Sequence, residues 1–135
     1  MHALGVKLSG YLRTGDLVLV NGPLGAGKTV FAQGVGAGLG ISGITSPTFV
    51  ISRVHKAVVP FIHVDAYRLM DSETSNLYLD DLDLDIAGSI TLIEWGGAES
   101  ARLSDDRLEI TIDRSDDVRK VEIRPVGVRW MGFSL

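Results

Sequence analysis

Apolar residues in this chain gather into short runs that glycine, proline and polar residues separate. Such runs predict buried strands over residues 17–20, 61–65 and 90–94, and a further strand over 49–54. Apolar positions at helical spacing predict a short amphipathic helix over residues 2–12. Strands that alternate with helical segments are typical of an α/β protein with a parallel sheet.

The C-terminal part of the chain has a different pattern. Apolar and polar residues alternate over residues 107–114 and 118–124, and Ser115-Asp116-Asp117 lies between them. This alternation predicts an antiparallel hairpin with one face in water. We expect residues 130–133, which include Trp130, to pack back on the core.

The segment GPLGAGKT at residues 22–29 matches the phosphate-loop pattern G-x-x-x-x-G-K-[ST]. It lies between the predicted strand 17–20 and a helix that we expect to begin at Thr29. Glycines allow successive backbone N–H groups to point at phosphate oxygens at a helix N-terminus. Lys28 is expected to contact the β- and γ-phosphates, and the Thr29 hydroxyl is expected to bind Mg²⁺. The sequence therefore predicts binding of a nucleoside triphosphate.

The motif and the hydrophobic pattern together predict a fold class. We expect a three-layer sandwich of the P-loop NTPase type, with a mostly parallel central sheet and an antiparallel C-terminal hairpin. A chain of 135 residues is long enough for one core, so residues 1–135 are expected to form a single domain.

Two predicted strands end in a carboxylate. Asp65 ends strand 61–65 in the manner of a Walker-B aspartate, and Glu94 ends strand 90–94 before a Gly-Gly turn. Ligands of open α/β sheets bind at such strand ends. Either residue could bind Mg²⁺ or activate water, and the sequence does not divide these roles. His63 leaves the same face of its strand as Asp65, and we expect it to orient that residue.

Other segments allow two interpretations each. Residues 45–48 carry three hydroxyls beside a proline, which suits either an ordinary turn or a switch that senses the γ-phosphate. Gly34, Gly36 and Gly38 indicate either close packing against the sheet or a yielding helix end. The acidic stretch 71–85 contains interspersed leucines and predicts a covered helix–turn element; its spacing does not fit a calcium loop.

Composition limits the classes of function. The net charge of −4 argues against a general nucleic-acid-binding surface, so any action on nucleic acid is expected to be indirect. The chain has no cysteine, which excludes disulfides and thiolate metal sites. It also lacks an apolar run long enough to cross a bilayer and a signal-peptide pattern, so we expect no membrane association and a cytoplasmic location.

Four stretches in this order resemble the TsaE (YjeE) family of bacterial ATPases: the phosphate loop, TSPTF at 45–49, HVDAYR at 63–68 and IEWG at 93–96. The resemblance runs from about Leu4 to Val121. It implies slow, Mg²⁺-dependent ATP hydrolysis that supports threonylcarbamoylation of adenosine 37 in tRNA. The implied partners are a TsaD-like transferase and a TsaB-like protein, and the chain itself would not transfer the group.

Site residues follow from the motifs and from this resemblance. Lys28, Asp65 and Glu94 are the expected catalytic residues, and Thr29, Asp65 and Glu94 are the expected magnesium ligands. The residues expected to contact ATP or ADP are Gly22, Leu24, Gly25, Ala26, Gly27, Lys28, Thr29, Val30 and Thr48.

Two other enzyme classes share the phosphate loop. A small-molecule kinase is the alternative, but it needs an acceptor pocket and a lid, for which 135 residues leave little room. A GTPase needs an N-K-x-D element, which the sequence lacks, and the DAYR stretch at 65–68 has no D-x-x-G glycine. An ATPase coupled to a partner complex is therefore the favoured interpretation.

Overall fold

The computed structural model describes residues 1–23, 27–41, 52–55, 60–65, 87–94, 104–113 and 120–134, with only the backbone described for 52–55 and 65. The elements within these ranges are α1 (His2–Ser9), β1 (Leu17–Asn21), α2 (Lys28–Gly38), β2 (Ser52–His55), β3 (Phe61–Asp65), β4 (Ile90–Glu94), β5 (Arg107–Asp113), β6 (Lys120–Val126) and the 3₁₀ helix η2 (Val128–Trp130).

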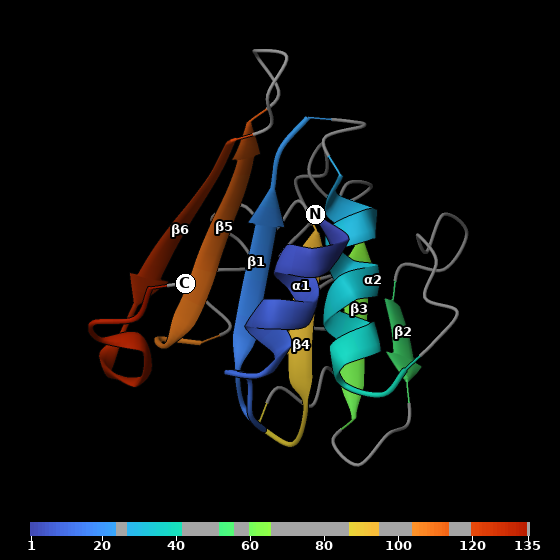
Figure 1. Cartoon of the computed structure of the whole chain (residues 1–135). Helices are drawn as coiled ribbons and strands as arrows, with labels where there is room; N and C mark the ends of the chain where they lie inside the picture. Colours follow the sequence, from blue (N-terminus) through green and yellow to red (C-terminus); the bar gives the residue numbers. More distant parts are fainter. Residues whose placement is uncertain are drawn as a thin grey trace, which may run out of the picture.

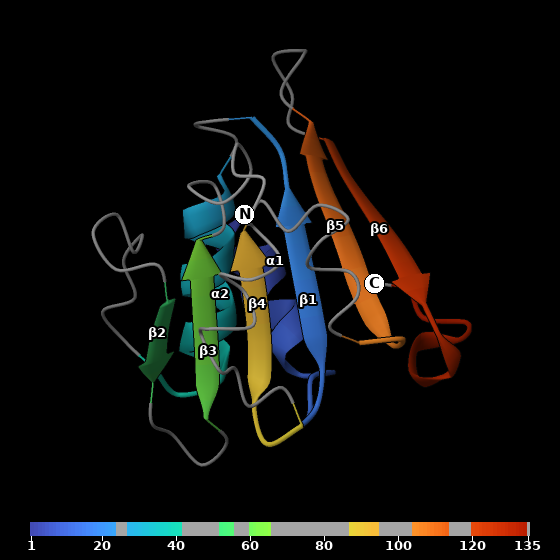
Figure 2. The ribbon, with the colours of Figure 1, turned by 180° about the vertical axis from the view of Figure 1, so that it is seen from behind.

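In the described part of the chain, the strands form one six-stranded sheet in the order β2-β3-β4-β1-β5-β6. The four central strands, β3, β4, β1 and β5, are parallel to one another, and β2 and β6 join the two edges in antiparallel fashion. Figures 1 and 2 show the four parallel arrows and the two edge strands that run against them. The predicted α/β class, mostly parallel sheet and antiparallel C-terminal hairpin are confirmed.

Strands β1 and β4 are buried on both faces, as a layered α/β fold requires, whereas β5 alternates buried with partly or fully exposed residues. Successive residues of β1 from Leu17 to Val20 are all buried, and so is every residue of β4. Helices α1 and α2 lie side by side on one face of the sheet (Figures 1 and 2). The core on this face includes Val18, Phe31 and Leu92. The helix–turn element that we predicted over residues 71–85 lies outside the described residues.

Glycines allow α1 and α2 to approach each other closely. A Cβ on Gly34 would lie 2.1 Å from the His2 carbonyl oxygen, and a Cβ on Gly5 would lie 2.3 Å from that of Phe31. A Cβ on Gly38 would meet the Ser9 hydroxyl oxygen at 1.8 Å. Close packing is thus the reason for Gly34 and Gly38, but the packing partner is α1 and not the sheet.

The C-terminal segment returns to the core as predicted. Trp130 is 1% exposed and belongs to the main hydrophobic cluster, and its ring makes an edge contact with Phe133. Strand β6 continues two residues beyond the predicted limit of 124 and includes Pro125, which pairs with Leu108. A proline is tolerated there because β6 is an edge strand, where one row of backbone groups has no neighbouring strand.

Other element limits differ modestly from the prediction. The first helix ends at Ser9 and not at Leu12, because the N–H groups of Tyr11 and Leu12 donate to carbonyl groups three residues back and tighten the chain into turns. Of the predicted strand 49–54, the described part is β2, which extends to His55; the switch candidate 45–48 lies outside the described residues. No helix in the described ranges is long and apolar enough to span a membrane.

Candidate functional site

The predicted phosphate loop joins β1 to α2 across residues 22–27. Gly27 has φ of 107°, a conformation that side-chain-bearing residues rarely adopt, and its carbonyl oxygen accepts the first α2 hydrogen bond, from the Phe31 N–H. No side chain in the described residues caps the N-terminus of α2. The first N–H groups of this 11-residue helix therefore have no partner within the helix and are suited to an anion. Leu24, Gly25 and Ala26 lie outside the described residues.

Hydrogen bonds hold the side chain of Lys28 at the start of the phosphate loop. Its side chain is 5% exposed, and its Nζ atom donates hydrogen bonds of 2.7 Å to the carbonyl oxygens of Gly22 and Pro23. The ammonium group therefore lies at the start of the loop, next to the end of β1. This is the location that the motif predicts for a lysine that contacts phosphate oxygens.

A chain of polar contacts connects α2 to β4 and β3. The Thr29 hydroxyl donates to Oε1 of Glu94 at 3.4 Å, and Oε2 of Glu94 lies 2.5 Å from Nε2 of His63. Glu94 is 3% exposed and His63 is fully buried. The structure thus brings together Thr29 and Glu94, two of the three predicted magnesium ligands.

Asp65 ends β3 directly beside Glu94. These two residues are register partners across the parallel pair β3–β4, so their backbones lie together at the carboxyl edge of the sheet. The side chain of Asp65 and all of Thr48 lie outside the described residues. The predicted contact of His63 with Asp65 is therefore untested, and the contact that the structure describes for His63 is with Glu94.

Hard oxygen donors are the ligands that Mg²⁺ prefers, and it commonly binds one or two protein groups together with water and substrate phosphates. The Thr29 hydroxyl and the Glu94 carboxylate provide such a pair at the N-terminus of α2. Within the described ranges, no cluster of three His, Cys, Asp or Glu residues could form a metal cage. The residues present thus fit a magnesium ion that shares its coordination with a phosphate.

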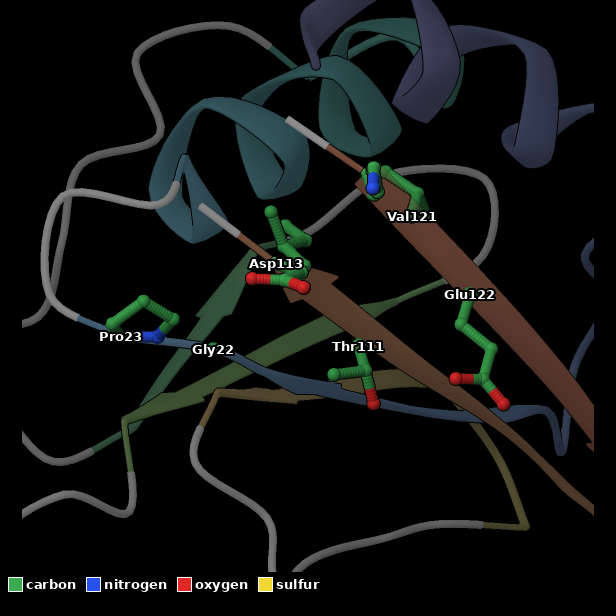
Figure 3. Close-up of a pocket in the computed structure, with 8 residues that line it drawn as sticks. Gly22, Pro23, Thr111, Asp113, Val121 and Glu122 are labelled. Carbon is green, nitrogen blue, oxygen red and sulfur yellow. The ribbon is translucent and has the colours of Figure 1, made fainter. Parts of the chain in front are cut away.

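A pocket of about 410 Å³ lies on the other side of β1. It begins at the phosphate loop and continues along the hairpin, as Figure 3 shows with Gly22 and Pro23 at the end of β1, Asp113 on β5 and Glu122 on β6. Its volume is within the usual range for small-molecule sites. Its lining consists of Gly22, Pro23, Thr111, Ile112, Asp113, Lys120, Val121 and Glu122.

Sequence reasoning did not assign the hairpin residues of this pocket to the site. The available signal was that β5 enters the sheet beside the phosphate-loop strand, since ligands collect at the carboxyl ends of neighbouring parallel strands. Val30, a predicted nucleotide contact, lies in the first turn of α2 and is 43% exposed.

Comparison with known proteins places the chain in a family. The family model described as "Threonylcarbamoyl adenosine biosynthesis protein TsaE" matches residues 1–121. A Streptomyces coelicolor protein named tRNA threonylcarbamoyladenosine biosynthesis protein TsaE is 45% identical over 141 residues, which cover 96% of this chain and 93% of that protein. The Bacillus subtilis protein of the same name is 37% identical over 131 residues, which cover 95% and 81% of the two chains.

A solved structure agrees with these matches. The crystal structure of Bacillus subtilis YdiB superposes with a TM-score of 0.73 at 33% identity, covering 96% of this chain and 82% of that one. The family model extends over the phosphate loop, the strand ends, β5 and the start of β6. The chain therefore belongs to the TsaE family of tRNA threonylcarbamoyladenosine biosynthesis proteins.

Proposed function

We propose that this protein binds ATP with Mg²⁺ and hydrolyses it slowly to ADP in support of the threonylcarbamoylation of tRNA. The observation that carries the proposal is the contact between Thr29, in the first turn of α2, and the buried Glu94 at the end of β4. It joins a helix N-terminus suited to phosphate to a carboxylate suited to a hard cation.

The residues on the two sides of the phosphate loop support one orientation of the bound nucleotide. Glu94 and His63 lie on the β4 and β3 side of β1, whereas the pocket lies on the β5 and β6 side. We therefore assign the terminal phosphate to the first flank and the nucleoside to the pocket beside Thr111. The β-phosphate would bind between them, at the N–H groups of α2 and the ammonium group of Lys28.

Each residue then has a chemical task. Lys28 would exchange its carbonyl partners for phosphate oxygens and offset charge that develops on them. Thr29 and Glu94 would hold Mg²⁺, which neutralises phosphate charge in such sites. Asp65, the register partner of Glu94, ends the neighbouring strand, and we assign to it the orientation of the attacking water.

The partners are proposed from the family. The name of the relatives refers to the biosynthesis of threonylcarbamoyladenosine in tRNA. We propose that a TsaD-like transferase and a TsaB-like protein receive the ATP-bound form, and that hydrolysis releases it. The net charge of −4 supports an indirect role toward tRNA.

Calorimetry with ATP and ADP in the presence of Mg²⁺ tests the nucleotide site. Lys28→Ala is expected to abolish binding, because it removes the charge that faces the phosphates. Glu94→Gln is expected still to bind nucleotide but to gain less affinity from Mg²⁺, and to reduce hydrolysis by about 100-fold or more. Lys7→Ala, an exposed change on α1, is the matched control and should bind as the unaltered protein does.

Hydrolysis measured with and without the TsaB–TsaD pair tests the coupling. We expect slow turnover alone and a clear increase with the pair. Well-folded protein that takes up neither ATP nor ADP would refute the proposed site. Fast turnover that the pair does not change would refute the coupling alone.

A further inference from the structure

His63 is an unusual residue for its position. It is fully buried in the middle of the sheet, and its Nε2 atom contacts a carboxylate that is itself 3% exposed. Burial of a polar ring and a carboxylate is unfavourable unless the two groups satisfy each other. Nε2 of His63 and Oε2 of Glu94 lie 2.5 Å apart, within hydrogen-bond distance, so the two groups are joined by a hydrogen bond.

Packing fixes the ring of His63. The ring stacks on Phe61 of the same strand at a centroid distance of 6.4 Å and an interplanar angle of 16°. Residues 61, 63 and 65 share one face of β3, and Glu94 is the register partner of residue 65 on the neighbouring strand. The ring therefore has little freedom to turn away from Glu94.

The two oxygens of Glu94 consequently have different partners. Oε2 faces His63, while Oε1 faces the hydroxyl of Thr29 at the N-terminus of α2. We propose that His63 is a positioning residue that keeps Oε2 of Glu94 occupied, so that Glu94 presents only Oε1 to the cation beside Thr29. This inference rests on the proposed function, because it concerns the same nucleotide and magnesium site.

One-oxygen binding has a consequence for the choice of metal. Mg²⁺ demands near-ideal octahedral geometry, whereas Ca²⁺ is larger and readily takes both oxygens of one carboxylate. A Glu94 whose Oε2 is held by His63 suits Mg²⁺ and disfavours Ca²⁺. Groups behind a metal ligand that fix its orientation commonly change metal affinity by about 10–100-fold when they are replaced.

The test compares His63→Gln with His63→Asn. A glutamine amide can place an N–H donor near the position of Nε2, while the shorter asparagine cannot reach Oε2. Both are neutral amides of similar polarity, so they serve as matched controls for burial. The quantity measured is the factor by which Mg²⁺ tightens ADP binding, obtained by calorimetry with Mg²⁺ and with a chelator.

We expect His63→Asn to lower this factor by about tenfold or more and His63→Gln to retain most of it, while ADP affinity in chelator stays unchanged in both. We also expect Ca²⁺, relative to Mg²⁺, to tighten ADP binding more in His63→Asn than in the unaltered protein, because Oε2 of Glu94 becomes available. If His63 only filled the core, both substitutions would reduce the effect of Mg²⁺ and the effect of Ca²⁺ on ADP binding by the same factor.

A second measurement uses the unaltered protein and decides the matter if the variants do not fold. In protein labelled with ¹⁵N-histidine, addition of Mg²⁺ to the ADP complex should shift the Nε2 resonance of His63 through the change at Glu94. An unmoved resonance, or equal magnesium factors in the Asn and Gln variants, overturns the inference while nucleotide binding stands. Absence of ADP binding in the unaltered protein overturns the proposed function and this inference together.

Discussion

Asp16 lies in the turn that leads into β1 and is 4% exposed. Its carboxylate accepts hydrogen bonds from the Arg13 N–H at 2.7 Å and from Nε and Nη2 of Arg129 at 3.1 Å each. The guanidinium of Arg129 also lies 4.0 Å from the centroid of the Trp130 ring. The Asp16 carboxylate thus connects the C-terminal segment to the start of the sheet through a bidentate ion pair with Arg129.

We expect Asp16→Ala to lower the free energy of unfolding by about 2 kcal/mol, because the Arg13 N–H loses its acceptor and the guanidinium of Arg129 keeps, among the described residues, only the Tyr11 carbonyl oxygen. Urea unfolding measures the change. Glu109→Ala is the matched control, since its pair with Arg107 is partly exposed at 24% and 19% and should contribute about 1 kcal/mol or less. Equal losses in the two variants would show that burial does not distinguish these pairs.

The residues of the site differ in how far a sequence could place them. Lys28 and Thr29 were predictable because the motif itself sets their spacing on a loop and a helix. Glu94 was predictable as a strand-end carboxylate. The sequence could not show which of Glu94 and Asp65 would bind Mg²⁺ and which would activate water. The partner of His63 could not be read from the chain, because side-chain alternation gives the face of a strand and not which residue of the next strand lies within reach.

At the scale of elements, the contact between α1 and α2 depends on glycine. Gly34 and Gly38 are four residues apart and so lie on one side of α2, where a side chain at either position would collide with α1. The sequence indicated that these glycines needed an explanation, since each costs about 1 kcal/mol in a helix relative to alanine. It could not reveal the partner, because α1 precedes the sheet and could have packed elsewhere.

Gly34→Ala is expected to destabilise the protein by about 1–3 kcal/mol despite the better helix propensity of alanine, because its Cβ would lie 2.1 Å from a backbone oxygen. Gly10→Ala is the control. Its φ of −66° suits alanine, and the nearest atom to a Cβ is 3.6 Å away, so we expect a gain of up to about 1 kcal/mol. Thermal unfolding of both variants measures this, and a stabilising Gly34→Ala would contradict the described packing.

Strands were predicted more accurately than the first helix. The limits of β3 agreed to the residue and β4 begins at the predicted residue, because a continuous apolar run has sharp ends when it is buried on both faces. The first helix was predicted to reach Leu12 because this residue continues the apolar spacing. Leu12 does pack against the core, but from a turn beyond the helix, so its burial did not require helical geometry.

At the scale of the molecule, the order of the strands places the Glu94 site and the pocket on opposite sides of β1. β4 and β3 lie on one side with Glu94, and β5 and β6 lie on the other with the pocket. Under the proposed function, metal and phosphate binding would therefore be separated from recognition of the nucleoside. The family model matches both parts, since its residues 1–121 include β5 and the start of β6.

Thr111→Trp tests this separation. Thr111 is exposed on β5 and lines the pocket, so an indole there should occlude it and raise the dissociation constant for ATP by about tenfold, or about 1.4 kcal/mol. Binding of inorganic tripolyphosphate should not change, because the phosphate loop is untouched. Glu109→Trp, two residues earlier on the same strand and outside the pocket, should leave both affinities unaltered. Equal weakening of ATP and tripolyphosphate would argue against a nucleoside in this pocket.

The hydrogen bonds from Lys28 to the carbonyl oxygens of Gly22 and Pro23 have a kinetic consequence. A lysine side chain loses about 2 kcal/mol of rotamer entropy when it is ordered, and here that ordering accompanies folding and does not await a ligand. Under the proposed function, an arriving phosphate would meet an ammonium group that is already ordered and has only to change acceptors. Capture would then depend on diffusion and on exchange of the Lys28 hydrogen bonds, with no slow search of side-chain conformations beforehand.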